Sequence, residues 1–207
     1  MRSHHAGATV LTVALLALAV SASAFATTTG IVIENPQLVV QRGRWTFNNG
    51  MGLVFQCNST MLKRLIVGQL IPVREPLTRL GKVRAGRLAP ECPFNTRFLN
   101  LPLQLGEGMP GPLAESWDIS FLSSNLATGA LNFGILDFQV RIVLPGTMGC
   151  LYRGTLLGTL SADGRTLTYA SGLPLAEGLG CPGAIAITGT FTNEPAIAYS
   201  LLIAPEA

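Results

Sequence analysis

Two acidic residues flank a tryptophan in the segment Glu115-Ser116-Trp117-Asp118. A pair of carboxylates held about 5–10 Å apart can hydrolyse a glycosidic bond, and an indole ring can stack on a sugar. Glu115 and Asp118 are therefore the candidate acid pair of a carbohydrate-active enzyme. The same pattern is also typical of a buried tryptophan that lies beside two solvated acids at the end of a loop.

Four basic residues, Arg79, Lys82, Arg84 and Arg87, lie within nine consecutive positions. Basic side chains at alternate positions of a strand, such as Lys82 and Arg84, share one face, and a row of them can bind a phosphate or carboxylate polymer. These four residues are the candidate polyanion-binding site. A solvated strand face, or an edge strand protected from aggregation by its charge, would give the same pattern.

Charge is divided unevenly between the two halves of the chain. Between Arg42 and Arg97 there are ten basic and two acidic residues, whereas from Phe98 onward there are three basic and eight acidic residues. This asymmetry predicts a basic surface that attracts polyanions. If the two halves interleave in one fold, the charges instead neutralise each other.

Several kinds of chemistry are absent from the sequence. Both histidines, His4 and His5, lie in the segment 1–26, so a mature chain that begins at residue 27 has no histidine base or histidine metal ligand. There is no CxxC and no phosphate-binding GxxxxGK[ST]. The two GxGxxG matches, 106–111 and 178–183, carry proline at the fifth position and are interpreted as turns. We expect no catalytic residue, cofactor, metal or nucleic-acid partner.

The N-terminal segment 1–26 has the pattern of an export signal. Arg2 precedes an apolar run of 13 residues, 8–20, and Ala24-Phe25-Ala26 is a small-x-small cleavage site. We expect a signal helix cleaved after Ala26, or alternatively after Ala24. An uncleaved anchor is the other interpretation, although a spanning helix needs about 20 residues. The prediction is a secreted protein, free or associated with the cell wall, with a single β domain at 27–207 and no stable membrane span.

Four cysteines, Cys57, Cys92, Cys150 and Cys181, indicate two disulfides in an exported protein. Three pairings are possible. We favour Cys57–Cys92 and Cys150–Cys181, because each of these bonds closes a modest loop of two or three strands.

The composition and the apolar alternation predict an all-β fold. Only 12% of residues are charged, and 23 glycines and 13 prolines punctuate the chain. The strongest strand pattern is Asn132–Leu144, with a phase slip near Leu136-Asp137 that indicates a bulge. Ala162-Asp163-Gly164-Arg165 is typical of a hairpin turn. About ten strands with short connections imply an antiparallel β-sandwich or barrel.

Two further segments carry definite expectations. Thr27–Pro36 is predicted to be a loose lead-in or an edge strand. Arg97–Leu105 alternates cleanly from Leu99 and predicts a full strand. The segment Gly106–Pro112, rich in glycine and proline, predicts a loop.

The order of features along the chain resembles uncharacterised small secreted β proteins of actinobacterial type with four cysteines. The features are a strand ending at Cys57, a basic middle, Cys92, Trp117, Cys150-Leu151-Tyr152, and Cys181 before a terminal β pair. The resemblance implies an exported, disulfide-linked β domain and transfers no catalytic residue. We expect a secreted non-enzymatic domain that binds a cell-wall polyanion or another surface protein. The alternatives are a carbohydrate-active enzyme and a self-assembling extracellular structural subunit.

Overall fold

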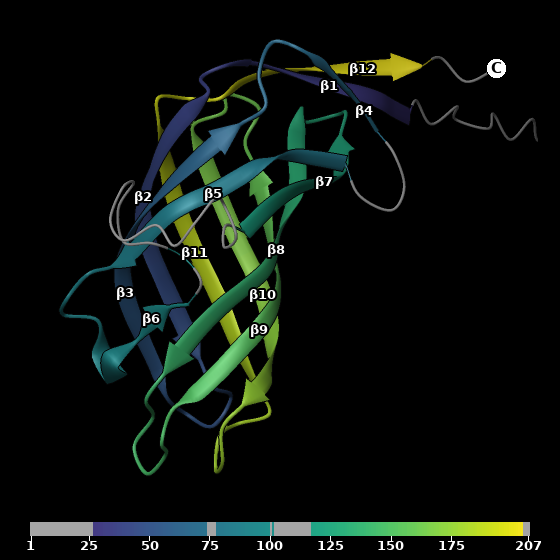
Figure 1. Cartoon of the computed structure of the whole chain (residues 1–207). Coiled ribbons are helices and arrows are strands. Elements are labelled where there is room, and N and C mark those ends of the chain that lie inside the picture. Colours follow the sequence, from purple (N-terminus) through teal and green to yellow (C-terminus); the bar gives the residue numbers. More distant parts are fainter. Residues whose placement is uncertain (1–26, 74–77, 100, 102–116, 205–207) are drawn as a thin grey trace, which may run out of the picture.

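The computed structural model describes residues 27–73, 78–99, 101 and 117–204 (Figure 1). The predicted signal segment 1–26, the predicted loop Gly106–Pro112 and the candidate acid Glu115 lie outside the described residues. The strands are β1 (Thr27–Asn35), β2 (Leu38–Asn48), β3 (Val54–Leu65), β4 (Leu70–Pro72), β5 (Thr78–Leu88), β6 (Arg97–Phe98), β7 (Trp117–Asn125), β8 (Ala130–Ile142), β9 (Cys150–Leu160), β10 (Thr166–Glu177), β11 (Ala184–Glu194) and β12 (Ala198–Ala204), with one 3-10 turn, η1 (Pro93–Asn95).

Eight of these strands form a closed antiparallel barrel. Their order is β8-β7-β5-β3-β2-β11-β10-β9, and pairing between β8 and β9 closes the ring. The short β6 pairs with the end of β8, and a small sheet of order β12-β1-β4 lies across one end of the barrel (Figure 1). The prediction of an all-β antiparallel barrel is confirmed.

The barrel interior is filled with side chains, as the alternation predicts for a ring of eight strands. β3 shows the alternation most clearly, with every second residue from Phe55 to Leu65 buried or nearly so. Aromatic rings occupy the centre: the ring centroids of Trp45 and Phe191 are 4.4 Å apart, and those of Trp117 and Phe138 are 4.6 Å apart. This packed interior fixes the outward direction of the intervening residues.

The predicted bulge and hairpin are both present. The β8–β9 register shifts between Ile135 and Phe138, and Asp137 has a positive φ of 56°. Asp137 is exposed and forms an ion pair with Arg153, so the bulge points it to solvent. In the turn after β9, Gly164 has a φ of 67° and Asp163 Oδ1 accepts a hydrogen bond of 3.0 Å from the Arg165 amide.

One strand prediction was wrong, and a second holds for only part of its described residues. β1 is the central strand of the small sheet, between β12 and β4, because Ile31 and Ile33 are buried there. Among the described residues of the expected strand Arg97–Leu105, Arg97–Phe98 form a strand and Leu99 lies in a bend. β7 already occupies the same edge of β8 from Ala130 to Ile135, so only the far end of β8 is available to β6. Residues 102–105 lie outside the described part of the chain.

The favoured disulfide pairing is confirmed. Cys57 is bonded to Cys92 with a Cα–Cα distance of 5.0 Å, and Cys150 to Cys181 with a distance of 5.7 Å. Two such bonds indicate folding in an oxidising environment. Within the residues described here, no helix has the length and hydropathy to cross a bilayer.

Candidate functional site

The three strands that carry the basic residues are neighbours in the barrel. β2, β3 and β5 lie side by side, bordered by β7 on one side and β11 on the other (Figure 1). Strands from the two halves of the chain therefore do not alternate in this part of the barrel. The outward-facing cations of these strands, which we call the basic face, are Arg42, Arg44, Arg64, Arg79, Lys82, Arg84 and Arg87.

All four predicted residues on β5 belong to this face, although their spacing of three, two and three does not fit strict alternation. Two register shifts explain the spacing. One lies against β7 between Arg79 and Gly81, and the other, against β3, leaves Arg84 unpaired between Val83 and Ala85. Each bulge adds one residue to the strand and so changes which positions face outward. As a result, all four side chains are exposed or half-exposed.

The register places like charges directly opposite each other. Arg64 on β3 pairs with Lys82 on β5, and Lys82 pairs in turn with Asp118 on β7. Side chains in such positions are about 5 Å apart, and like charges there are destabilising. Placing Arg64 opposite Lys82 therefore lowers the stability of the fold, and the packing of the barrel does not require this pair of cations.

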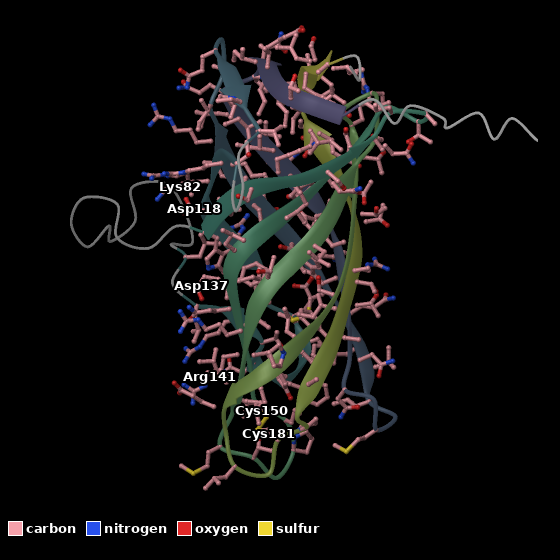
Figure 2. The ribbon with its side chains drawn as sticks, turned by 90° about the vertical axis from the view of Figure 1, so that its right-hand side faces the viewer. Lys82, Asp118, Asp137, Arg141, Cys150 and Cys181 are labelled. Carbon is pink, nitrogen blue, oxygen red and sulfur yellow. A yellow bond between two sulfur atoms is a disulfide. The ribbon has the colours of Figure 1, made fainter. Side chains whose placement is uncertain are left out.

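One hollow of the basic face, which we call the β3–β5 groove, has a volume of about 490 Å³. Its charged lining consists of Arg64, Arg79, Lys82 and Arg84. Asp118 Oδ1 lies 3.2 Å from Arg79 Nε and 3.6 Å from Lys82 Nζ, and Figure 2 shows Lys82 and Asp118 next to each other. Across the described ranges, Arg64 and Arg84 form no ion pair with an acidic side chain.

A second hollow, which we call the β2–β3 hollow, has a volume of about 780 Å³ and is lined by Arg42, Arg44 and Arg87. Thr60 of β3 pairs with Arg42 on one side and with Arg87 on the other, so the two arginines lie about 10 Å apart. Arg42 is paired with Glu194 of β11. Among the described residues, Arg44 bonds to neutral groups: its Nε donates to Asn58 Oδ1 at 3.1 Å and its Nη1 to Gln56 Oε1 at 3.4 Å.

Of the candidate acid pair, Asp118 lies in the described part of the chain and Glu115 does not. Asp118 lies within ion-pairing distance of Arg79 and Lys82. Trp117 is 2% exposed and packs against Phe98 and Phe138, so its ring is not available to stack on a sugar. This placement agrees with the structural explanation of the acid–tryptophan pattern.

Sequence reasoning missed three arginines of the basic face and misplaced one lysine. Arg42, Arg44 and Arg64 were counted in the net charge but not singled out, and only the strand order brings them beside β5. Lys63 was counted with the ten basic residues between Arg42 and Arg97, yet it is 2% exposed and lies inside the barrel. The sequence does indicate this position, because Lys63 is two residues from both Met61 and Leu65 and therefore shares their side of the strand.

The described ranges contain no cluster of three or more potential metal ligands. Figure 2 also shows Asp137 and Arg141 farther along the side that carries Lys82, where Asp137 is paired with Arg153. No family model, curated protein or solved structure matches the chain.

Proposed function

We propose that this protein is a secreted, non-enzymatic β-barrel that binds an anionic polymer of the cell surface through the basic face. One observation carries the proposal: seven cations lie on three adjacent strands, and the ion pairs reaching them from the bordering strands come from Asp118 and Glu194 alone among the described residues. A polymer with repeated phosphate or carboxylate groups is the ligand that this charge pattern favours.

The dimensions of the basic face suit an extended polymer better than a single small anion. Lys82 and Arg87 are five positions apart on β5, which corresponds to about 16 Å along the strand. The β3–β5 groove and the β2–β3 hollow therefore offer two separate clusters of cations. A flexible chain can contact both clusters at once, and each contact raises the effective concentration of the next.

The proposed location outside the cell rests on the predicted signal segment and the two disulfides. Electrostatic attraction to a wall polymer would retain part of the secreted protein at the surface. Because exposed charges are screened by salt, the retained fraction is expected to fall as ionic strength rises.

The test is binding of the oxidised chain 27–207 to polyphosphate and to polygalacturonate over a salt series, with dextran as the neutral control. R64Q/R84Q removes two cations of the β3–β5 groove, and R141Q/R165Q removes two cations elsewhere, the half-buried Arg141 and the exposed Arg165, as the control. Exposed ion pairs are each worth roughly 0.2–1 kcal/mol, so the first variant is expected to bind about tenfold more weakly at low salt.

The control variant is expected to bind like the wild type. Equal losses in the two double variants would mean that net charge, and not the basic face, determines binding. An absence of binding to both polymers at low salt would overturn the proposal.

A further inference from the structure

Lys63 is a buried cation inside the barrel. It is 2% exposed, and its Nζ lies 5.2 Å from the centroid of the Phe133 ring and 5.5 Å from that of Tyr169. Its hydrogen bond goes to Tyr169 Oη, at 2.8 Å. In the part of the chain that the structure describes, no acidic side chain forms an ion pair with it.

A cavity of about 30 Å³ adjoins Lys63 at the end of the barrel covered by the small sheet. Its walls are mostly apolar, with Leu65, Leu80 and Ile119 from the barrel and Ile33 from β1. Tyr199 of β12 also lines it and directs its hydroxyl to Gly129 O, at 2.6 Å. A water needs roughly 10–15 Å³, so the cavity has room for a group of about two heavy atoms beside the Lys63 side chain.

The polar groups behind Lys63 form a short hydrogen-bonded chain. Tyr169 Oη accepts from Lys63 Nζ and donates to Gln41 Oε1 at 3.1 Å, and Gln41 is 0% exposed. Burial lowers the pKa of Lys63 to about 7 and raises the pKa of Tyr169. A fraction of the amine is therefore uncharged at neutral pH, next to a phenol that keeps its proton.

We propose that Lys63 is a covalent binding site for a small unbranched aldehyde, which enters the cavity and forms an imine with Nζ. This site uses residues on the inside of the barrel and is independent of the basic face. An aldehyde suits the cavity better than a carboxylate does, because a neutral carbonyl group loses little hydration on entering apolar surroundings, whereas a carboxylate loses a great deal.

The reaction balances without any oxidant or reductant. The lone pair of Lys63 Nζ attacks the carbonyl carbon, and the C=O electron pair moves onto oxygen, which takes up a proton to give a carbinolamine. The C–O bond then breaks as the C=N bond forms, and water leaves with the proton lost from nitrogen. Tyr169 Oη, 2.8 Å from Nζ, is placed to donate a proton to the departing hydroxyl group and to recover one from nitrogen.

The test uses the fact that the chain contains two lysines, Lys63 inside the barrel and Lys82 on its surface. The oxidised chain 27–207 is incubated at neutral pH with ethanal, which adds two carbons to an amine, and with cyanoborohydride, which reduces an imine to a stable secondary amine. Peptide mass spectrometry then measures the label at each lysine. Faster labelling of Lys63 than of Lys82 is expected, and the branched aldehyde pivaldehyde is expected to reverse that order because the cavity excludes it.

Labelling of Lys82 before Lys63 with ethanal, with Lys63 labelled only in denaturant, would overturn the proposal. So would equal labelling of Lys63 by ethanal and pivaldehyde, because that result would place the amine in open solvent. The Y169F variant removes the proton donor and is expected to slow labelling at Lys63 by about a hundredfold, with Lys82 unchanged as the internal control. An unchanged rate at Lys63 in Y169F would overturn the role of Tyr169.

Discussion

Replacing Lys63 with methionine is expected to stabilise the folded protein at neutral and acidic pH. Methionine keeps the unbranched shape of the side chain and removes the charge from the apolar interior. In the wild type, the ammonium group loses its hydration on folding and gains one hydrogen bond, to Tyr169 Oη. The balance of these two effects sets the size of the change.

The pKa of Lys63 falls from 10.5 to about 7 on burial. Each tenfold change in proton affinity is worth about 1.4 kcal/mol, so burying the charged form costs about 5 kcal/mol at pH 6. K63M also loses the hydrogen bond to Tyr169, which is worth about 1 kcal/mol. The expected net gain in the free energy of unfolding is therefore about 4 kcal/mol at pH 6.

The pH dependence has a definite sign. Between pH 7 and 10.5 the unfolded chain holds a proton on Lys63 that the folded chain releases, so the stability of the wild type rises with pH in this window. Below pH 7 both states hold the proton and the full cost remains. The advantage of K63M over the wild type should therefore shrink by about 3 kcal/mol between pH 6 and pH 9.

Urea unfolding followed by tryptophan fluorescence at pH 6 and pH 9 measures both differences, since Trp45 and Trp117 are buried. K82M, which removes the surface lysine, is the matched control and is expected to show no such pH-dependent gain. A K63M protein less stable than the wild type at pH 6, or an advantage that stays constant with pH, would refute the reasoning.

Two further predictions concern the fold. The free energy of unfolding of G164A, measured in urea, is expected to fall by more than about 2 kcal/mol. The reason is that Gly164 has a φ of 67° and an added Cβ would lie 1.8 Å from Ile197 O. G172A is the control, because nothing lies within 4 Å of the Cβ added there. C150S/C181S removes a bond that spans 31 residues and is expected to lose about 3 to 4 kcal/mol of stability. A loss in G164A no larger than that in G172A would contradict the first prediction. A C150S/C181S variant that melts like the wild type would contradict the second.

Local patterns in the sequence predicted the local structure well. Alternation identified β8, and the phase slip at Leu136-Asp137 located its bulge, because a change of phase leaves a visible mark in the spacing of apolar residues. Asp163-Gly164 marked its turn for the same kind of reason, since the turn needs a residue that tolerates a positive φ. The disulfide pairing was predicted because each bond closes a modest loop of two or three strands.

Long-range pairing was beyond the reach of those patterns. Closure of the barrel by β8 and β9, and the position of β1 between β12 and β4, depend on partners distant in the chain. The same limit applied to the candidate site. The residues of β5 were visible as a cluster, but the neighbouring arginines of β2 and β3 join them only through the strand order. The buried position of Lys63 was missed because basic residues were counted along a whole segment. In a strand, consecutive residues face opposite sides, so a segment count does not separate the inward residues from the outward ones.

Lys63 and Arg64 are consecutive residues of β3, and each breaks a local rule on its own side of the strand. Lys63 places an amine in an apolar interior, and Arg64 faces the like charge of Lys82 across the strand pair. The large aromatic core and the two disulfides supply the stability that lets the barrel carry both costs. Proteins tend to keep such violations where a ligand compensates for them. The two sides of β3 are therefore the places where binding partners should be sought, an aldehyde inside and a polyanion outside.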